Sequence, residues 1–184
     1  MPTREDAWAL LNEYTKNKNL VKHGLAVEAA MRHYAKHFGG DEETWGMVGL
    51  LHDFDYEKYP SLNDHPYRGQ EILERAGYPE EVRRGIMAHA PHTGTARATQ
   101  MHKTVFAVDE LTGFIVAVAL IRPSKKLTDV DVAAVKKKMK QKAFAAAVKR
   151  EDIEQGAAEL GLPLDEHIQH VLTAMQGAAD VLGL

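Results

Sequence analysis

The stretch DEETWGMVGLLHD, residues 41–53, combines a helical apolar pattern with an adjacent histidine and aspartate at its end. Asp41 is a good N-cap, because its carboxylate can accept hydrogen bonds from the free amide groups of a first helical turn. From Trp45 to His52, apolar residues recur three or four positions apart and therefore share one face of a helix. The pattern predicts a helix whose inward stripe ends at His52.

His52 and Asp53 have two interpretations. Neighbouring side chains on a helix point about 100° apart, so an imidazole and a carboxylate at a helix end can both reach one metal ion. Equally, the aspartate can cap a loop while the histidine makes a hydrogen bond in the core. The dipeptide alone favours this second interpretation, and the rest of the chain has to decide between them.

Helical spacing continues on both sides of this stretch, and no segment alternates polar and apolar residues as a half-buried strand does. We therefore expect an all-α fold. Helices are expected at about residues 20–38, 65–76, 80–89 and 96–119, of which the first carries His23 and the last Asp109. Gly39 and Gly40 are expected to end the first of them.

The C-terminal third is set apart by a break at Arg122-Pro123-Ser124. Residues 125–150 hold nine Lys or Arg and two Asp, a local charge of +7 in a chain whose net charge is −3. Thr128 or Asp129 is expected to cap this basic segment. The final helix carries a regular apolar stripe, which is typical of a packing face: Ile168, Val171, Leu172, Met175, Ala179 and Leu182.

The amino-acid composition excludes several kinds of functional site. The chain has 184 residues and no cysteine, so a thiolate metal site, a disulfide and a cysteine nucleophile are excluded. Its length fits one domain, 1–184. The N-terminus does not resemble a secretory signal, and the most apolar stretch, 105–121, is interrupted by two acids. We expect a soluble, cytoplasmic protein without a membrane partner.

Ten histidines are many for this length, and their positions are informative. His33, His37, His167 and His170 are interpreted as solvated or packing residues. The remaining histidines lie in the first 102 residues, at or near expected helix ends or inward faces.

The order His23, His52-Asp53, Asp109 resembles the four-ligand signature of the HD superfamily of metal-dependent phosphohydrolases, and GLLHD resembles that family's central helix. His65 in HPYRGQEIL and His89 in IMAHAPHTG are similar to the additional histidines of the subgroup that binds two metals. The pair is followed by Phe54-Asp55 where many relatives have Ile-Gly, and the third motif is His-Ala-Pro-His where many have consecutive histidines.

The resemblance covers about residues 20–120 and implies a metal-binding helical bundle, with residues 125–184 as a C-terminal helical extension. From AVDELTGFIVA onward, the chain is also similar to a bacterial group of HD-domain proteins identified as hydrolases of uncharacterised substrate. The resemblance therefore extends to nearly the whole chain, although it does not name a reaction.

One or two divalent ions are expected as cofactor. Two neutral imidazoles and two carboxylates suit Mn, Fe, Co, Ni or Zn better than Ca, and Mg is a less natural choice. The expected ligands of the first ion are His23, His52, Asp53 and Asp109. If His65 and His89 hold a second ion, Asp53 is the natural bridge between ions about 3.5–4 Å apart.

The resemblance implies hydrolysis of a small phosphorylated substrate, a nucleotide being one candidate, by attack of metal-bound hydroxide on phosphorus. Asp53 and His92 are the expected catalytic residues, with His92 as proton donor to the leaving alcohol; Asp55 and Asp64 are weaker candidates for that role. Arg122, Lys125 and Lys126 are the expected phosphate ligands.

Two alternative functions stay open. A pair of irons on the same six ligands can oxidise a C–H bond with oxygen, and a non-catalytic protein can bind a nucleotide or metal. The lysines at 136–142 can attract nucleic acid, but they lack interleaved aromatic residues and mostly form a solvated face, so we do not expect a nucleic-acid partner. The sequence leaves a homodimer open.

Overall fold

The computed structural model describes residues 2–184, which form α-helices, two short 3-10 helices and no strand. The all-α prediction is confirmed. The N-terminal half contains α1 (Arg4–Tyr14), α2 (Lys18–Phe38), α3 (Glu42–Leu51), α4 (Tyr67–Arg75) and α5 (Glu80–Ala88). It is followed by α6 (Gln100–Leu120), α7 (Val132–Met139), α8 (Arg150–Leu160), α9 (Leu164–Gly177) and the short α10 (Ala179–Leu182).

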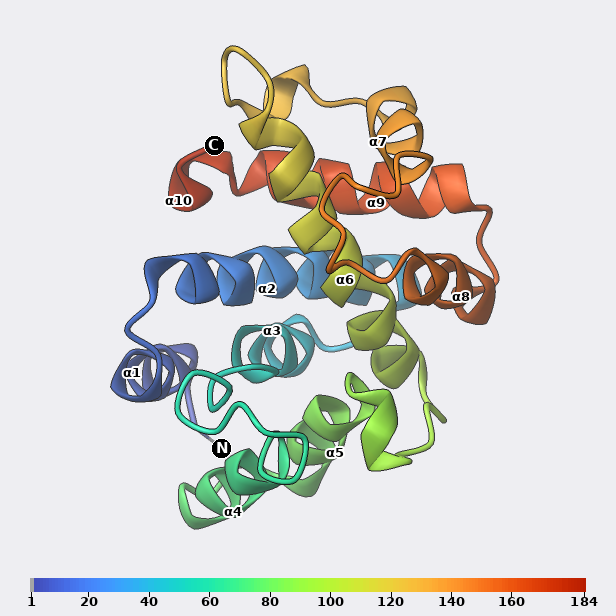
Figure 1. Ribbon diagram of the computed structural model, residues 1–184. Coiled ribbons are helices and arrows are strands. Elements are labelled where there is room, and N and C mark those ends of the chain that lie inside the picture. The colour runs from blue at the N-terminus through green and yellow to red at the C-terminus, as the bar shows by residue number, and fades with distance from the viewer. Residues whose placement is uncertain (1) are drawn as a thin grey trace.

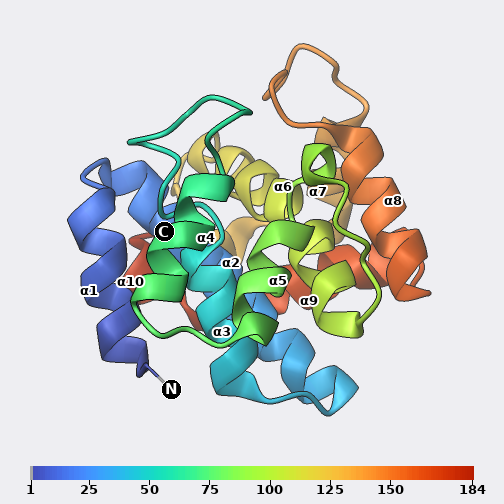
Figure 2. The same ribbon diagram turned by 90° about the horizontal axis from the view of Figure 1, so that it is seen from below.

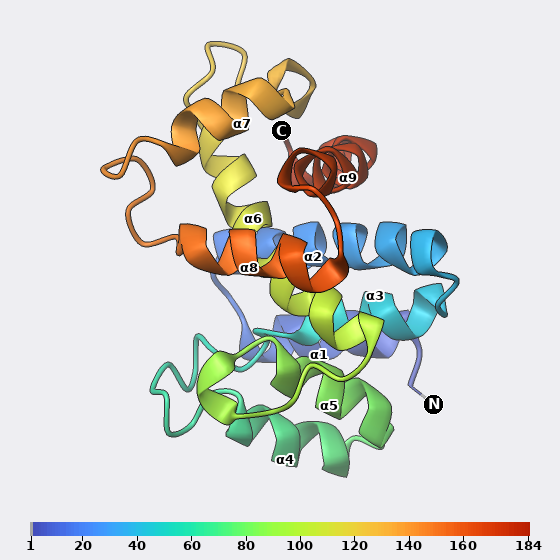
Figure 3. The same cartoon turned by 90° about the vertical axis from the view of Figure 1, so that its right-hand side faces the viewer.

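The long helix α2 lies in the middle of the molecule and packs against α3, α6 and α9 (Figure 1). Helix α6 crosses α2 and continues past it, so that α5 packs on one end of α6 and α7 on the other. Helix α8 lies against α6, as the view from the side shows (Figure 3). One cluster of buried apolar side chains runs through these layers from Ala7 to Leu182.

Helices α2 and α3 approach each other closely at two glycines. A Cβ atom on Gly49 would lie 2.8 Å from the carbonyl oxygen of Val27, and one on Gly24 would lie 3.0 Å from that of Leu50. Any side chain at Gly49 would therefore force two helix backbones apart. Gly24 and Gly49 each lie within three residues of an expected metal ligand, His23 or His52, so this contact sets the separation of those ligands.

Local signals place most helix ends as predicted. Asp41 accepts a hydrogen bond from the amide of Thr44 at 2.8 Å and begins α3. Gly39 ends α2 with a φ of 71°, a left-handed conformation that glycine adopts without steric cost. Helix α6 begins at Gln100 and not near residue 96, because the hydroxyl of Thr99 caps it by accepting from the amide of His102.

The predicted cap of the basic segment was wrong. Asp131 begins α7 by accepting a hydrogen bond from the amide of Ala134 at 2.8 Å. Thr128 and Asp129 lie in a 3-10 turn, where the Asp129 carboxylate accepts from the hydroxyl of Ser124 and is not free to cap a helix.

Within residues 2–184, no helix combines the length and apolar character needed to cross a bilayer.

Candidate metal centre

Six side chains from the N-terminal two thirds of the chain converge below α2, at the end of α3. His23 comes from α2, His52 and Asp53 from the C-terminal end of α3, and Asp109 from α6. His65 precedes α4, and His89 immediately follows α5. Figure 2 looks at the molecule from the side on which α4 and α5 lie.

The first group consists of His23, His52 and Asp109. The Nε2 atom of His23 lies 3.1 Å from that of His52 and 3.0 Å from Oδ1 of Asp109. Nε2 of His52 lies 3.4 Å from the same carboxylate oxygen. Three ligand atoms within 4.8 Å of one another can hold a metal ion.

The second group consists of Asp53, His65 and His89. Oδ1 of Asp53 lies 3.2 Å from Nε2 of His65 and 3.2 Å from Nε2 of His89. The other oxygen of the same carboxylate, Oδ2, lies 3.5 Å from Nε2 of His52. Asp53 therefore stands between the two groups and presents one oxygen to each.

The three most buried imidazoles are oriented by their remote nitrogens. Nδ1–H of His52 donates to the carbonyl of Gly49 at 2.8 Å, and Nδ1–H of His89 donates to that of Ile86 at 2.5 Å. Nδ1–H of His65 donates to Oδ1 of Asp55 at 2.8 Å. These bonds leave the Nε2 lone pairs free and direct them toward Asp53, which is how histidine ligands are held in metal sites.

The charges of the cluster fit a divalent cation. Burial alone would lower the pKa of His52, but the charges of Asp53 and Asp109 outweigh it and raise the pKa to about 9. Burial opposes ionisation of Asp53 as well, yet His52, His65 and His89 hold its pKa well below the usual range. The carboxylates thus attract positive charge into a buried cluster, and a metal ion can replace the protons that supply it.

This cluster is partly open to solvent. The side chain of His52 is fully buried, whereas His23, Asp53 and Asp109 keep 21%, 26% and 23% of their side-chain surface exposed. A cleft of about 140 Å³ borders the second group, and its lining includes His65, His89 and Asp109. A groove of about 380 Å³ borders the first group at His23. A small molecule can therefore reach the cluster from two sides.

His92 lies in the 3-10 helix Pro91–Thr93 and lines the cleft. Its Nε2–H donates to the backbone carbonyl of His65 at 2.9 Å, so that nitrogen holds the loop against the site. Sequence reasoning missed Glu110, which lines the same cleft and whose pKa is raised by burial and by the charge of Asp109.

Asp55 is not placed to act as the proton donor for which it was considered. It is 1% exposed, and its two oxygens accept hydrogen bonds from His65 and from the amide of Gly69 at 2.8 Å. A Cβ on Gly69 would lie 2.9 Å from the Asp55 carboxyl carbon, so glycine is needed for this bond. Asp55 positions a ligand and does not face a substrate. Asp64, the other weak candidate, is bonded to Ser61 and Arg68 at the surface.

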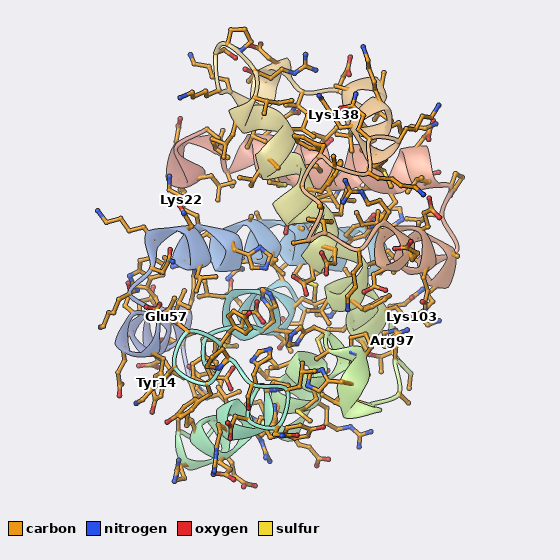
Figure 4. All side chains as sticks on the ribbon, viewed as in Figure 1. Tyr14, Lys22, Glu57, Arg97, Lys103 and Lys138 are labelled. Atoms are coloured by element: carbon orange, nitrogen blue, oxygen red, sulfur yellow. The ribbon has the colours of Figure 1, made fainter. Side chains whose placement is uncertain are left out.

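The three cations expected to bind phosphate are not brought to the site. Arg122 follows α6 thirteen residues after Asp109, a rise of about 20 Å along a helix. Neither Arg122, Lys125 nor Lys126 lines the cleft or the groove. The lysine run is remote as well: Lys138 lies on α7, toward the end of the molecule opposite α4 and α5 (Figure 1 and Figure 4).

Two other lysines are among the residues that line the cleft and the groove. Lys149 precedes α8 and lines the cleft with His65 and His89, while Lys22 lines the groove with His23. Lys149 belongs to the basic segment, and the turns of residues 140–149 bring it to the cleft, where its backbone amide donates to Glu110 at 3.3 Å. Lys22 could have been found from the sequence, because it directly precedes the expected ligand His23.

Comparison with known proteins gives one family. A family model described as the HD domain matches residues 20–119, which is more than half of the chain. The matched range extends from α2 to α6 and contains all six converging side chains. Comparisons with curated proteins and with solved structures gave no match.

Proposed function

The chain belongs to the HD domain family, and on this basis we propose that it is a metal-dependent phosphohydrolase that acts on a small phosphorylated molecule, with a nucleotide as one candidate. HD domains bind divalent metals, and the family consists mostly of metal-dependent hydrolases. The observation that supports the proposal most directly is the position of Asp53 between two groups of imidazole and carboxylate ligands.

The imidazole and carboxylate ligands favour a particular class of metal ion. Four imidazoles and two carboxylates would hold one or two ions of intermediate hardness, such as Mn, Fe, Co, Ni or Zn. When bound, such ions supply an acidified water and neutralise phosphate charge. His23, His52 and Asp109 would hold one ion, His65 and His89 the other, and Asp53 would contact both.

Two lysines are among the residues that line the cavities beside the ligands. Lys149 lines the cleft beside the second group, and Lys22 lines the groove beside the first. Lysine offers a mobile charge that suits a phosphate group. We propose Lys149 as a phosphate ligand in place of the three cations that follow α6, because the ammonium of Lys22 points toward Gly183 at the C-terminal end of the chain (Figure 4).

The groove suits the organic part of a substrate. Besides Lys22 and His23 it is lined mostly by apolar or small residues of α6, among them Val116, Ala117 and Leu120. Leu120 is 49% exposed, an apolar surface that a substrate would cover. A phosphate at the cluster and an apolar or aromatic group over α6 would use both features together.

His92 and Glu110 are two candidates for the proton donor. Both line the cleft. The Nε2–H of His92 is already engaged by the carbonyl of His65, so His92 would donate from Nδ1 as the imidazolium. The raised pKa of Glu110 favours its protonated form. If His92 is the donor, His92→Gln should lower kcat more than Glu110→Gln does, and the reverse order would assign the role to Glu110.

The proposal is tested with purified chain and a panel of phosphate mono- and diesters, assayed with Mn²⁺, Co²⁺, Ni²⁺ or Zn²⁺. Release of phosphate or alcohol that disappears with a chelator and with Asp53→Asn supports the proposal. No turnover of any ester, in protein shown to hold metal, would contradict it.

A carboxylate shared by two ligand groups also suits a pair of irons that oxidise a C–H bond with oxygen. The two enzyme classes differ in one simple measurement. A hydrolase works with Mn²⁺ or Co²⁺ without oxygen, whereas an oxygenase loaded with iron consumes oxygen at an electrode when substrate is added.

A further inference from the structure

A second cluster of histidines lies away from the metal centre, where α9 packs on α2. His33 and His37 are one turn apart on α2, and Glu166 and His170 are one turn apart on α9. His33 lies ten residues after His23, which is about 15 Å along a helix. The cluster is therefore separate from the ligands described above.

The rings of this cluster are in direct contact. Nε2 of His33 lies 2.9 Å from Nδ1 of His170. The ring centres of His37 and His170 are 4.6 Å apart, and Nε2 of His170 lies 3.8 Å from a carboxylate oxygen of Glu166. Three imidazoles and a carboxylate from two packed helices thus share one small region.

Burial and neighbouring charges favour the neutral form of His33 and of His170. Burial and the neighbouring His170, His37 and Lys36 lower the pKa of His33, and burial and His37 lower that of His170. Glu166 acts on His170 in the opposite sense, and Lys36 is paired with Glu42 at 3.2 Å. Neutral imidazole is the form that binds metal.

His167, the fourth histidine here, is already engaged. It is fully buried; its Nδ1 accepts a hydrogen bond from the Tyr34 hydroxyl at 2.6 Å, and its Nε2–H donates to the carbonyl of Ala107 at 2.9 Å. Both ring nitrogens are used, so His167 fixes α9 against α2 and α6. His33, His37 and His170 keep at least one ring nitrogen each for other partners.

We propose that His33, His37 and His170 form an additional binding site for a divalent ion of the zinc, nickel or copper type, while Glu166 lies on the Nε2 side of the His170 ring and can orient that ring. Two histidines four residues apart on one helix face are a recurrent metal-binding arrangement, and imidazole suits these ions. In the structure, the ring nitrogens of these three histidines do not converge on one point. His37 is exposed and its side chain can turn toward His170 without disturbing the core.

An ion in this position would join α9, in the C-terminal part of the chain, to the central helix α2. It would replace the direct contact between His33 and His170 by two bonds to a common centre. This site uses different residues from the proposed phosphohydrolase centre, so either proposal can be wrong while the other is right.

The test is the number of Zn²⁺ ions bound per chain at equilibrium dialysis, for the full-length protein and two variants. His37→Ala should bind one ion fewer than the unmodified chain. Lys36→Ala is the matched control on the same exposed turn and should bind the same number. Equal stoichiometry in the His37→Ala variant and the unmodified chain would overturn the proposal.

A second measurement identifies the ligands directly and does not depend on replacing any of them. Substoichiometric Cu²⁺ should broaden the imidazole C–H resonances of His33, His37 and His170 in an NMR spectrum of the Asp53→Asn protein. That of His102, which lies outside both clusters, should stay sharp. Sharp resonances for all three histidines would contradict the assignment.

Discussion

Oδ1 of Asp55 lies 2.8 Å from Nδ1 of His65, and this buried contact holds the His65 ring with its Nε2 toward Asp53. The second oxygen of Asp55 is fixed by the amide of Gly69 at 2.8 Å. Asp55 therefore connects the loop after α3 to the first turn of α4 and orients a metal ligand from behind. Partners of this kind are worth about 10- to 100-fold in metal affinity.

Asp55→Asn is expected to weaken binding of the ion held by His65 and His89, because the amide has one oxygen where the carboxylate has two, and its NH2 group would face either His65 or the amide of Gly69. Elemental analysis after dialysis should show about one ion fewer per chain, with the ion at His23 retained. Asp64→Asn is the matched control, since Asp64 is bonded only to Ser61 and Arg68 at the surface. Equal metal content in the two variants would show that Asp55 does not orient His65.

The fold could be predicted from the sequence where a local signal decides it. The end of α2 at Gly39 and the start of α3 at Asp41 depend on single residues whose conformations or side chains suit helix ends. The start of α7 was predicted at Thr128 or Asp129 and lies at Asp131, because the hydrogen bond from Ser124 to Asp129 is a feature of the folded loop that the sequence does not reveal.

The six converging side chains could be selected because their order resembles a family pattern, and each lies at or near a helix end or inward face. The residues that surround these six side chains could not be selected from the sequence. Lys149 faces the cleft through turns that no periodicity describes, and the buried role of Asp55 requires α4 to be in place. Arg122 follows the Asp109 helix in sequence, but a helix of this length carries it away from the site.

Gly49→Ala is expected to destabilise the chain and to disturb the ligands together. The added carbon would lie 2.8 Å from the carbonyl oxygen of Val27 and 2.9 Å from the Cα of Glu28, and neither backbone atom can move freely. Overpacking of this kind costs about 1–3 kcal/mol. Urea denaturation should detect it.

The control for this variant is Gly113→Ala, because a Cβ there meets nothing within 4 Å and alanine favours a helix interior. Gly113→Ala should be neutral or stabilising. A Gly49→Ala protein as stable as the Gly113→Ala protein would contradict the close approach of α2 and α3.

Stability should fall in mild acid through His167. Burial lowers the pKa of His167 to about 4, whereas a histidine in an unfolded chain titrates near 6.5. The unfolded chain binds the proton more readily, so the free energy of unfolding is at its full value above pH 6.5 and falls as the pH drops toward 4. Over this window the loss due to His167 is about 3 kcal/mol.

The measurement is urea denaturation at pH 7 and pH 4.5, with a chelator present, for the unmodified chain and His167→Gln. Other groups that titrate in this window are common to both proteins. The variant should therefore lose less stability between the two pH values than the unmodified chain. Identical losses would mean that His167 is not held neutral.

Lys149→Ala should lower kcat/KM for a phosphorylated substrate, by about tenfold for a lost interaction of roughly 1.4 kcal/mol. The lysine lines the cleft beside His65 and His89. Lys126→Ala is the control, because Lys126 belongs to the turn after α6 and lines neither the cleft nor the groove. A larger effect at Lys126 than at Lys149 would reverse the assignment of the phosphate ligand.

The central claim is that Asp53 serves two ligand groups at once. The most direct test is the metal content of Asp53→Asn beside that of His89→Ala, both purified without chelator and checked for folding by circular dichroism. His89→Ala should lose only the ion held with His65, whereas Asp53→Asn should lose metal from both groups. If Asp53→Asn kept the full metal content of the unmodified chain, the account of a shared carboxylate would be wrong.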